Sequence, residues 1–414
     1  MVWLSCIALV TSSVSCFSGV KVAGGRTHFI LMALLAFAIV ASLASKQLFG
    51  LSITALLNFS PSATLYLLTL INVNSMGRLK RSCATVACCA LLLAITSITS
   101  YHTGFMADRL VLRQTVEYDE TSELQSEVGN LIPALDASGK YLWRVRSFGF
   151  LADPNDFAQF IILALPLLFG FYRPSRNLLN LLLVYIPACT FLYTIYLTHS
   201  RGALLGVVAI ILFSSKRKFG LAPMILAMIA IGVASLLGGG RGFSSGEDSA
   251  SGRIDAWFEG LNMLYAYPLL GVGYGRFLDH HYLTAHNAFV LCFAELGLFG
   301  YFVWIAMIVC AIKALNEALQ FLSPDCEERR WCKLLRTSIV GFLVCAFFLS
   351  RTYAPSLYLL LALCICAARC GQWHLENLQT RSAPRPWHEI EWARTSMLVV
   401  LISISIIYLV VRMR

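Results

Sequence analysis

Three short stretches of the 414-residue sequence place side chains that can bind charge or accept a proton beside apolar runs. Arg201 lies in Thr-His-Ser-Arg-Gly, Arg253 in Ser-Gly-Arg-Ile-Asp, and His286 in Thr-Ala-His-Asn-Ala. A guanidinium offers a planar fork of donors that matches phosphate oxygens, so both arginines are candidates for binding an anion. A neutral imidazole titrates near ambient pH, which makes His286 a candidate general base for an attacking hydroxyl.

Each of these residues also has a structural interpretation. Arg201 is at the end of an apolar run and can snorkel to the membrane boundary. Arg253 can begin a helix or lie on a surface, and His286 can cap a helix or lie at the interface. The run Asp279 to His281 adds two histidines. Adjacent histidines point to different faces of an element and no metalloprotease-like spacing is present, so we expect no metal site.

The elements that position these residues are expected to be membrane helices. The chain is 58% hydrophobic and only 13% charged, with a mean hydropathy of +0.72. A span needs roughly 20 apolar residues, and its backbone polar groups must be satisfied internally. Continuous apolar runs favour helices over barrel strands. They lie near residues 2–20, 29–45, 51–73, 82–101, 157–172, 178–198, 202–214, 219–238, 287–312, 334–350, 352–368 and 396–411.

These runs predict an all-α polytopic transmembrane helical bundle of about twelve spans. Asn58 and Pro61 favour a break in the third span. Lysine and arginine gather in the odd-numbered loops, and such an excess is typical of short cytoplasmic loops. The excess of basic residues in cytoplasmic loops therefore explains the net charge of +10, and we expect no nucleic-acid partner. The two long connectors, residues 102–156 and 239–286, then face outward.

The outer connectors hold the remaining candidates. In the second, an amphipathic helix is expected from Arg253 onward, lying at the membrane surface. The glycines from Gly271 to Gly275 predict a turn around Tyr274, without the pattern of a dinucleotide fingerprint. The first connector ends with Arg146 and the stretch GFLADPNDFA. Asp153 or Asn155 in this stretch can cap the following helix.

Together these stretches resemble the O-antigen ligase and O-antigen polymerase superfamily of bacterial inner-membrane proteins. The matching residues are Arg146 with GFLADPNDFA, THSRGALLG, GRIDAW followed by PLLGVGYGRF, and AHNAFVLCFAELGLFGYF, in the family's order from Arg146 to Phe302. The resemblance implies a membrane-embedded glycosyltransferase of the GT-C-like class. It would use an undecaprenyl-pyrophosphate glycan donor in a metal-independent, inverting transfer, without a cofactor.

The resemblance also implies a location and roles for residues. The protein would be a multi-pass protein of the bacterial inner membrane with its active face in the periplasm. Arg201 and Arg253 would bind the pyrophosphate, and His286 would act on an acceptor hydroxyl of a glycan, a lipid A core or a protein. The expected substrate-binding residues are Arg146, Asp153, Asn155, Ser200, Tyr274 and Asn287.

We expect one integral membrane domain over residues 1–414. It would comprise the outer loop 102–156, a ligase/polymerase core over 157–370 that includes the outer loop 239–286, and a cytoplasmic loop with the final span over 371–414. The alternatives are a polymerase that joins lipid-linked repeat units, and a transporter or flippase for lipid-linked sugars. A transporter is less favoured, because the spans are nearly free of charge apart from Glu295 and charge gathers at one face.

Overall fold

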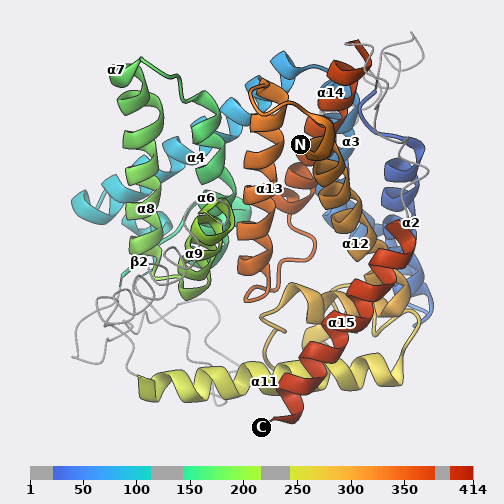
Figure 1. The fold of residues 1–414 in the computed structure, drawn as a ribbon. Helices are drawn as coiled ribbons and strands as arrows, with labels where there is room; N and C mark the ends of the chain where they lie inside the picture. The colour runs from blue at the N-terminus through green and yellow to red at the C-terminus, as the bar shows by residue number, and fades with distance from the viewer. Residues whose placement is uncertain (1–21, 113–142, 216–242, 378–391, 414) are drawn as a thin grey trace. The chain divides into compact units, whose positions relative to one another are not determined.

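The computed structural model describes residues 22–112, 143–215, 243–377 and 392–413, and most of them are helical (Figure 1). The expected spans at 2–20 and 219–238 lie outside the described residues. The larger helices are α2 (Arg26–Ala44), α3 (Phe49–Asn72), α4 (Met76–Thr103), α6 (Pro154–Leu168), α8 (Ile186–Thr198), α9 (Arg201–Ser215), α11 (Phe243–Ala266), α12 (Ala288–Phe321), α13 (Glu327–Ala346), α14 (Pro355–Asn377) and α15 (Trp392–Arg412).

Short elements join these helices. They are the helix α5 (Ala107–Leu110), the two-residue strands β1 (Val111–Leu112) and β2 (Arg144–Val145), and the single turns η1 (Gly149–Leu151), η2 (Phe169–Phe171) and η4 (Phe277–Asp279). The segments α7 (Asn177–Asn180) and η3 (Leu181–Tyr185) lead into α8, and η3 is π-helical. The strands form one antiparallel pair, in which Val111 faces Val145.

Eight helical segments within the described residues are long and apolar enough to cross a membrane, by length and composition. This agrees with an all-α polytopic membrane protein. The expected run 202–214 lies in α9, which is a shorter apolar helix. The expected run 334–350 lies largely in α13, whose first turns carry charged residues. The total of about twelve spans stays a prediction.

The break expected at Pro61 is not found, because α3 continues through it from Phe49 to Asn72. Proline has no N–H group and leaves the carbonyl four residues earlier without its helical donor. The hydroxyl of Ser60 donates to that carbonyl, on Leu57, at 2.8 Å. A neighbouring side chain thus replaces the missing hydrogen bond.

The chain forms two compact units, one of Met1–Thr85 with Ser251–Arg414 and one of Val86–Ala250. In the first unit, α12 packs against α2, α13, α14 and α15, while α3 packs against α2 and α14. Helix α11 runs crosswise to α13 (Figure 1). In the second unit, α6 packs against α8 and α9, and nearly all of its residues are buried. The expected single membrane domain stays a prediction.

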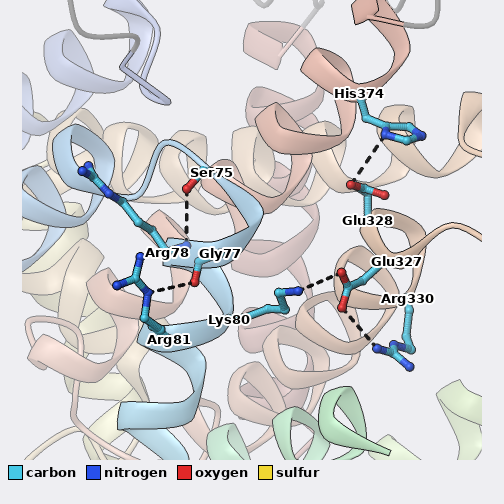
Figure 2. Close-up of polar contacts among 9 residues, drawn as sticks. All are labelled: Ser75, Gly77, Arg78, Lys80, Arg81, Glu327, Glu328, Arg330 and His374. Atoms are coloured by element: carbon cyan, nitrogen blue, oxygen red, sulfur yellow. Dashed lines mark hydrogen bonds and ion pairs between the residues drawn. The ribbon is translucent and has the colours of Figure 1, made fainter. Parts of the chain in front are cut away.

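Charged side chains from three helix ends meet at one end of the first unit (Figure 2). Lys80, near the start of α4, pairs with Glu327 at the start of α13 across 2.9 Å. Arg330 contacts the other oxygen of Glu327 at 3.4 Å, and His374, near the end of α14, lies 3.6 Å from Glu328. These segments belong to the loops that the charge distribution predicts to be cytoplasmic.

The opposite end of α13 leads to a different set of contacts. Ser350, four residues beyond the end of this helix, donates a hydrogen bond of 3.1 Å to the hydroxyl of Thr284. A helix of 20 residues is about 30 Å long. We call the end where Lys80, Arg330 and His374 lie the basic end of the first unit. The segment that precedes His286 therefore lies about one membrane thickness from this basic end.

Candidate functional site

Arg201 is the first residue of α9 and follows a tight turn between two helices of the second unit. Helix α8 ends at Thr198, and His199 adopts the left-handed conformation with φ of 49°. Ser200 then caps α9, because its hydroxyl accepts a hydrogen bond of 3.3 Å from the backbone N–H of Ala203. The structure thus gives the buried Ser200 a structural contact and leaves Arg201 exposed.

Arg144 ties this turn to the start of α6. Its Nε donates to the carbonyl oxygen of Thr198 at 2.8 Å, and one terminal nitrogen donates to Oδ1 of Asn155 at 3.0 Å. The side chain is buried, so these bonds satisfy a cation that would otherwise be costly to remove from water. The carbonyl at the end of α8 is also the negative end of that helix, which favours a guanidinium there.

The stretch GFLADPNDFA begins α6 as the capping interpretation predicts. Asp153 accepts hydrogen bonds from the backbone N–H groups of Asn155 at 2.7 Å and Asp156 at 3.4 Å, and Pro154 occupies the first turn. The side chain of Asn155 is directed to Arg144. Arg146 is partly exposed and donates to the backbone carbonyls of Arg109 and Asp108, each at 3.0 Å.

In the first unit, α11 lies directly against the segment that leads into His286. A Cβ on Gly252 would be 3.2 Å from Cδ1 of Leu283, so glycine permits the close approach. One turn later, the indole N–H of Trp257 donates to the carbonyl oxygen of Ala285 at 2.9 Å. Ala285 immediately precedes His286 in the chain, as Gly252 precedes Arg253. The structure therefore brings together the two segments that carry these candidates.

His286 adopts a positive φ of 45° and is partly exposed. Asn287 follows it and caps α12, accepting hydrogen bonds from the backbone N–H groups of Phe289 at 2.9 Å and Val290 at 3.2 Å. Left-handed backbone is uncommon for residues other than glycine, although histidine and asparagine adopt it more readily than most. His199 and His286 thus share one arrangement: each has a positive φ and precedes the capping residue of a helix.

The glycine-rich segment near Tyr274 is held by a break in α12. Gly297 interrupts the helix with φ of 64° and ψ of −170°. The carbonyls of Ala294 and Glu295 accept hydrogen bonds from the backbone N–H groups of Val272 at 2.9 Å and Gly273 at 3.0 Å. A Cβ on Gly297 would lie only 2.3 Å from the backbone carbon of Leu269. The predicted turn is therefore present, and it pairs with the interrupted helix.

The carboxylate of Glu295 holds the second half of this turn. It accepts hydrogen bonds from the backbone N–H groups of Gly275 and Phe277, and from the hydroxyl of Tyr353 at 2.9 Å. The ring of Tyr353 lies 4.5 Å from the ring of Tyr274. Burial raises the pKa of Tyr274 to about 12, with the carboxylate of Glu295 as the second cause. Tyr274 is therefore a neutral hydrogen-bonding group at physiological pH.

The histidines and acidic residue considered as a metal site make other contacts. Asp279 pairs with Arg276 at 2.5 Å. A ring nitrogen of His281 lies 3.0 Å from the carbonyl oxygen of Leu283. Within the ranges that the structure describes, no group of three His, Cys, Asp or Glu side chains is arranged to hold a metal ion.

Residues 186–305 match the family model described as O-Antigen ligase. The match supports membership of the O-antigen ligase superfamily. This superfamily suggests an O-antigen ligase-like or polymerase activity, which is a glycosyltransferase activity with lipid-linked glycan and acceptor as partners. A comparison with curated proteins finds no match.

The part matched by the O-antigen ligase model contains Arg201, Arg253 and His286, and it begins after Arg146 and Asn155. The sequence places Arg144 and Arg146 in one polar stretch, and only Arg146 was predicted to bind substrate. The structure places Arg144, and not Arg146, against the turn before Arg201. Both arginines lie in the same polar stretch, and nothing in the sequence of this stretch distinguishes them. The contacts of Glu295 with the turn were likewise missed.

Proposed function

We propose that the protein transfers a glycan from an undecaprenyl-pyrophosphate donor to an acceptor hydroxyl on the periplasmic face. The reaction is O-antigen ligase-like, inverting and metal-independent. The observation that carries this proposal is the O-antigen ligase match over residues 186–305, which contains both candidate arginines and the candidate base. The local structure supports it, because Arg201 and His286 lie where helices begin and the segments carrying Arg253 and His286 are in contact.

Arg201 and Arg253 are assigned to the pyrophosphate. The first residues of a helix leave N–H groups without intrahelical partners and carry partial positive charge, which favours an anion beside Arg201. When the bond between the sugar and the pyrophosphate breaks, its electron pair passes to the departing phosphate oxygen. Guanidinium groups directed at that oxygen stabilise the charge where it develops. The donor already carries the energy of the transfer, so no nucleotide is required.

His286 is assigned to the acceptor. The acceptor oxygen forms a bond to the anomeric carbon on the side opposite to the pyrophosphate, which inverts the configuration there. The hydroxyl proton passes to the imidazole as the oxygen attacks. The products are the glycosylated acceptor, undecaprenyl pyrophosphate and a protonated His286. The partial exposure of this residue is compatible with access by a hydroxyl from solution.

Purified protein in detergent, with an undecaprenyl-pyrophosphate glycan and a separately supplied acceptor, tests these roles. The variants Arg201→Ala, Arg253→Ala and His286→Ala are expected to fold and to lose transfer. Arg81→Ala is a matched control, since Arg81 is an exposed arginine at the basic end of the first unit. Turnover retained in all three variants would reject the assignment. Added EDTA should leave the rate unchanged.

The periplasmic assignment rests on charge. Arg81 belongs to a basic loop, whereas His280 belongs to the segment near the other end of α13, and both side chains are exposed. We expect Arg81→Cys to react with a membrane-impermeant maleimide only after cells are permeabilised, and His280→Cys to react in intact cells. Both variants are made in a background without reactive native thiols. The opposite labelling pattern would place the candidate residues in the cytoplasm.

The family also suggests a polymerase, whose acceptor is a second lipid-linked repeat unit. Supplying only the lipid-linked donor distinguishes the two activities. A ligase leaves the donor unchanged until a lipid A core or another separate acceptor is added. A polymerase converts the donor alone into a ladder of longer lipid-linked chains.

A further inference from the structure

A row of aromatic side chains runs over the second unit and ends beside Arg201. It consists of Trp143, Tyr101, His102, Tyr193, Tyr196 and His199, and we call it the aromatic row. These rings come from the segment before β2, from the last turn of α4, and from α8 with the turn that follows it. They are therefore brought together by folding from three separate parts of the chain.

Each ring of the aromatic row contacts the next. The ring centroids of Trp143 and Tyr101 are 6.3 Å apart, and those of Tyr101 and His102 are 5.2 Å apart. His102 stacks on Tyr193 at 6.0 Å with an interplanar angle of 7°, and its Nε2 lies 2.8 Å from the hydroxyl of Tyr193. Tyr193 stacks on Tyr196 at 6.4 Å. The row is thus continuous and has fixed internal contacts.

The end of the row lies next to the proposed phosphate site. The ring of Tyr196 is 5.9 Å from that of His199, which is two residues before Arg201. Tyr193, Tyr196 and His199 are spaced by three residues and so lie on one side of α8 and its C-terminal turn. Trp143 is 38%, Tyr193 39% and Tyr196 51% exposed, so the rings present surface that a ligand can cover.

The composition of the row indicates what covers it. All six rings carry an N–H, O–H or ring nitrogen that can hydrogen-bond, and their faces are apolar. Nε2 of His102 and the hydroxyl of Tyr193 pair with each other, and lipid chains do not hydrogen-bond to polar atoms of this kind. Exposed residues elsewhere in the same helical segment include the aliphatic Leu182, Ile186 and Leu192, as well as Tyr185. Aliphatic side chains suit lipid, whereas the rings of the aromatic row, with their polar atoms, suit a ligand with both C–H faces and hydroxyl groups, which is a sugar.

We propose that the aromatic row binds the oligosaccharide of the donor, whose sugars stack on the rings while its pyrophosphate lies at Arg201. This inference rests on the proposed function, because that function assigns Arg201 to the pyrophosphate. The alternative for exposed tyrosine and tryptophan is an interfacial belt that anchors the protein in the bilayer. A belt requires neither ring-to-ring contact nor histidine, so the observations favour the sugar.

Tyr196→Leu and Tyr196→Phe test the proposal in the full chain. Leucine keeps an apolar side chain that lipid tolerates but removes the ring, whereas phenylalanine keeps the ring. Tyr185→Leu is the matched control, because Tyr185 is 47% exposed in η3, ahead of α8, and is not part of the row. The Michaelis constant is measured for a donor carrying an oligosaccharide and for one carrying a single sugar.

We expect Tyr196→Leu to raise the Michaelis constant for the oligosaccharide donor about tenfold, which corresponds to ~1.4 kcal/mol. The value for the single-sugar donor should change much less, and kcat should change little for either. Tyr196→Phe, which keeps the ring and loses the hydroxyl, should raise the Michaelis constant less than Tyr196→Leu does, and Tyr185→Leu should resemble the parent protein. Equal effects on both donors, a change in the acceptor constant alone, or a loss of thermal stability without a change in either constant would overturn the proposal.

A binding measurement separates this inference from the proposed function. The probe is the oligosaccharide released from the donor by mild acid, and its contact with the purified protein is followed by saturation-transfer NMR. Transfer of saturation that is lost in Tyr196→Leu and kept in Tyr185→Leu supports the sugar site even where no glycan transfer is detected. Absence of saturation transfer with the parent protein, or equal transfer in both variants, would contradict the sugar site even where glycan transfer is active.

Discussion

Replacing Glu295 with glutamine tests how the glycine-rich turn around Tyr274 is held. The carboxylate accepts three hydrogen bonds, from the hydroxyl of Tyr353 and from the backbone N–H groups of Gly275 and Phe277. Glutamine preserves the shape but presents one oxygen and one NH2 group, so at least one donor faces another donor. A buried donor without an acceptor costs about 1–3 kcal/mol, and the remaining bonds become neutral and weaker by roughly 1 kcal/mol each.

These contributions give a loss of roughly 3–5 kcal/mol for Glu295→Gln. For a unit of about 250 residues, such a loss lowers the melting temperature by roughly 6–20 °C. A displacement of the turn by about 1 Å can reduce catalysis up to a hundredfold where a substrate group is misplaced. We therefore expect glycan transfer by the folded variant to fall between tenfold and a hundredfold.

Thermal unfolding in detergent and the transfer assay measure the two effects on the same preparation. Tyr353→Phe is the graded control, because it removes one donor and leaves the carboxylate with two backbone partners. It should cost about 1 kcal/mol and reduce transfer less than Glu295→Gln does. A glutamine variant with the melting temperature and transfer rate of the parent protein would show that the carboxylate does not hold the turn.

Further predictions concern the other contacts described above. Gly297→Ala forces a Cβ into the backbone of the adjacent loop at a φ of 64°, and should sharply reduce the yield of monodisperse protein in size-exclusion chromatography. Arg144→Lys can keep only part of the contacts to the turn and to α6, and should lower stability in thermal unfolding by about 1–3 kcal/mol. Arg146→Ala, at a partly exposed side chain, should lower it less. Lys80→Ala removes a half-exposed ion pair, and should change stability by about 1 kcal/mol or less, with a difference that shrinks in high salt.

The apolar runs predicted helix positions well where the membrane sets the limits. The runs at 178–198 and 202–214 correspond to Asn177–Thr198 and Arg201–Ser215, and the turn between them is correctly placed. The run at 287–312 predicted the start of α12 but not its end at Phe321, because the helix continues beyond the apolar segment. Hydropathy indicates which residues can lie in the membrane. A helix continues beyond the end of its apolar run when its later residues pack against other helices.

Predictions of helix breaks from the local sequence were wrong or missing where a distant residue or one neighbouring hydroxyl determines the backbone conformation. Pro61 favoured a break, yet the hydroxyl of Ser60 satisfies the carbonyl that proline leaves unpaired, and α3 continues. Gly297 gave no sign of its role, because its partner is the backbone at Leu269, on a separate segment. A glycine in an apolar run is equally compatible with helix packing and with a break. Only the tertiary contact distinguishes them.

In the candidate site, residue type indicates which chemistry a side chain can perform, but it does not indicate where the fold places that side chain. Residue type made Arg201, Arg253 and His286 candidates, and the resemblance to the O-antigen ligase superfamily supplied their roles, which stay predictions. Residue type could not rank Arg144 above Arg146. The two guanidinium groups are chemically equal and two residues apart, but one is buried against Thr198 and the other lies on exposed carbonyls. A buried cation must be satisfied by whatever the fold brings to it. The function of such an arginine is therefore a property of its tertiary partners, and Arg144 is the residue whose loss should disturb the turn before Arg201.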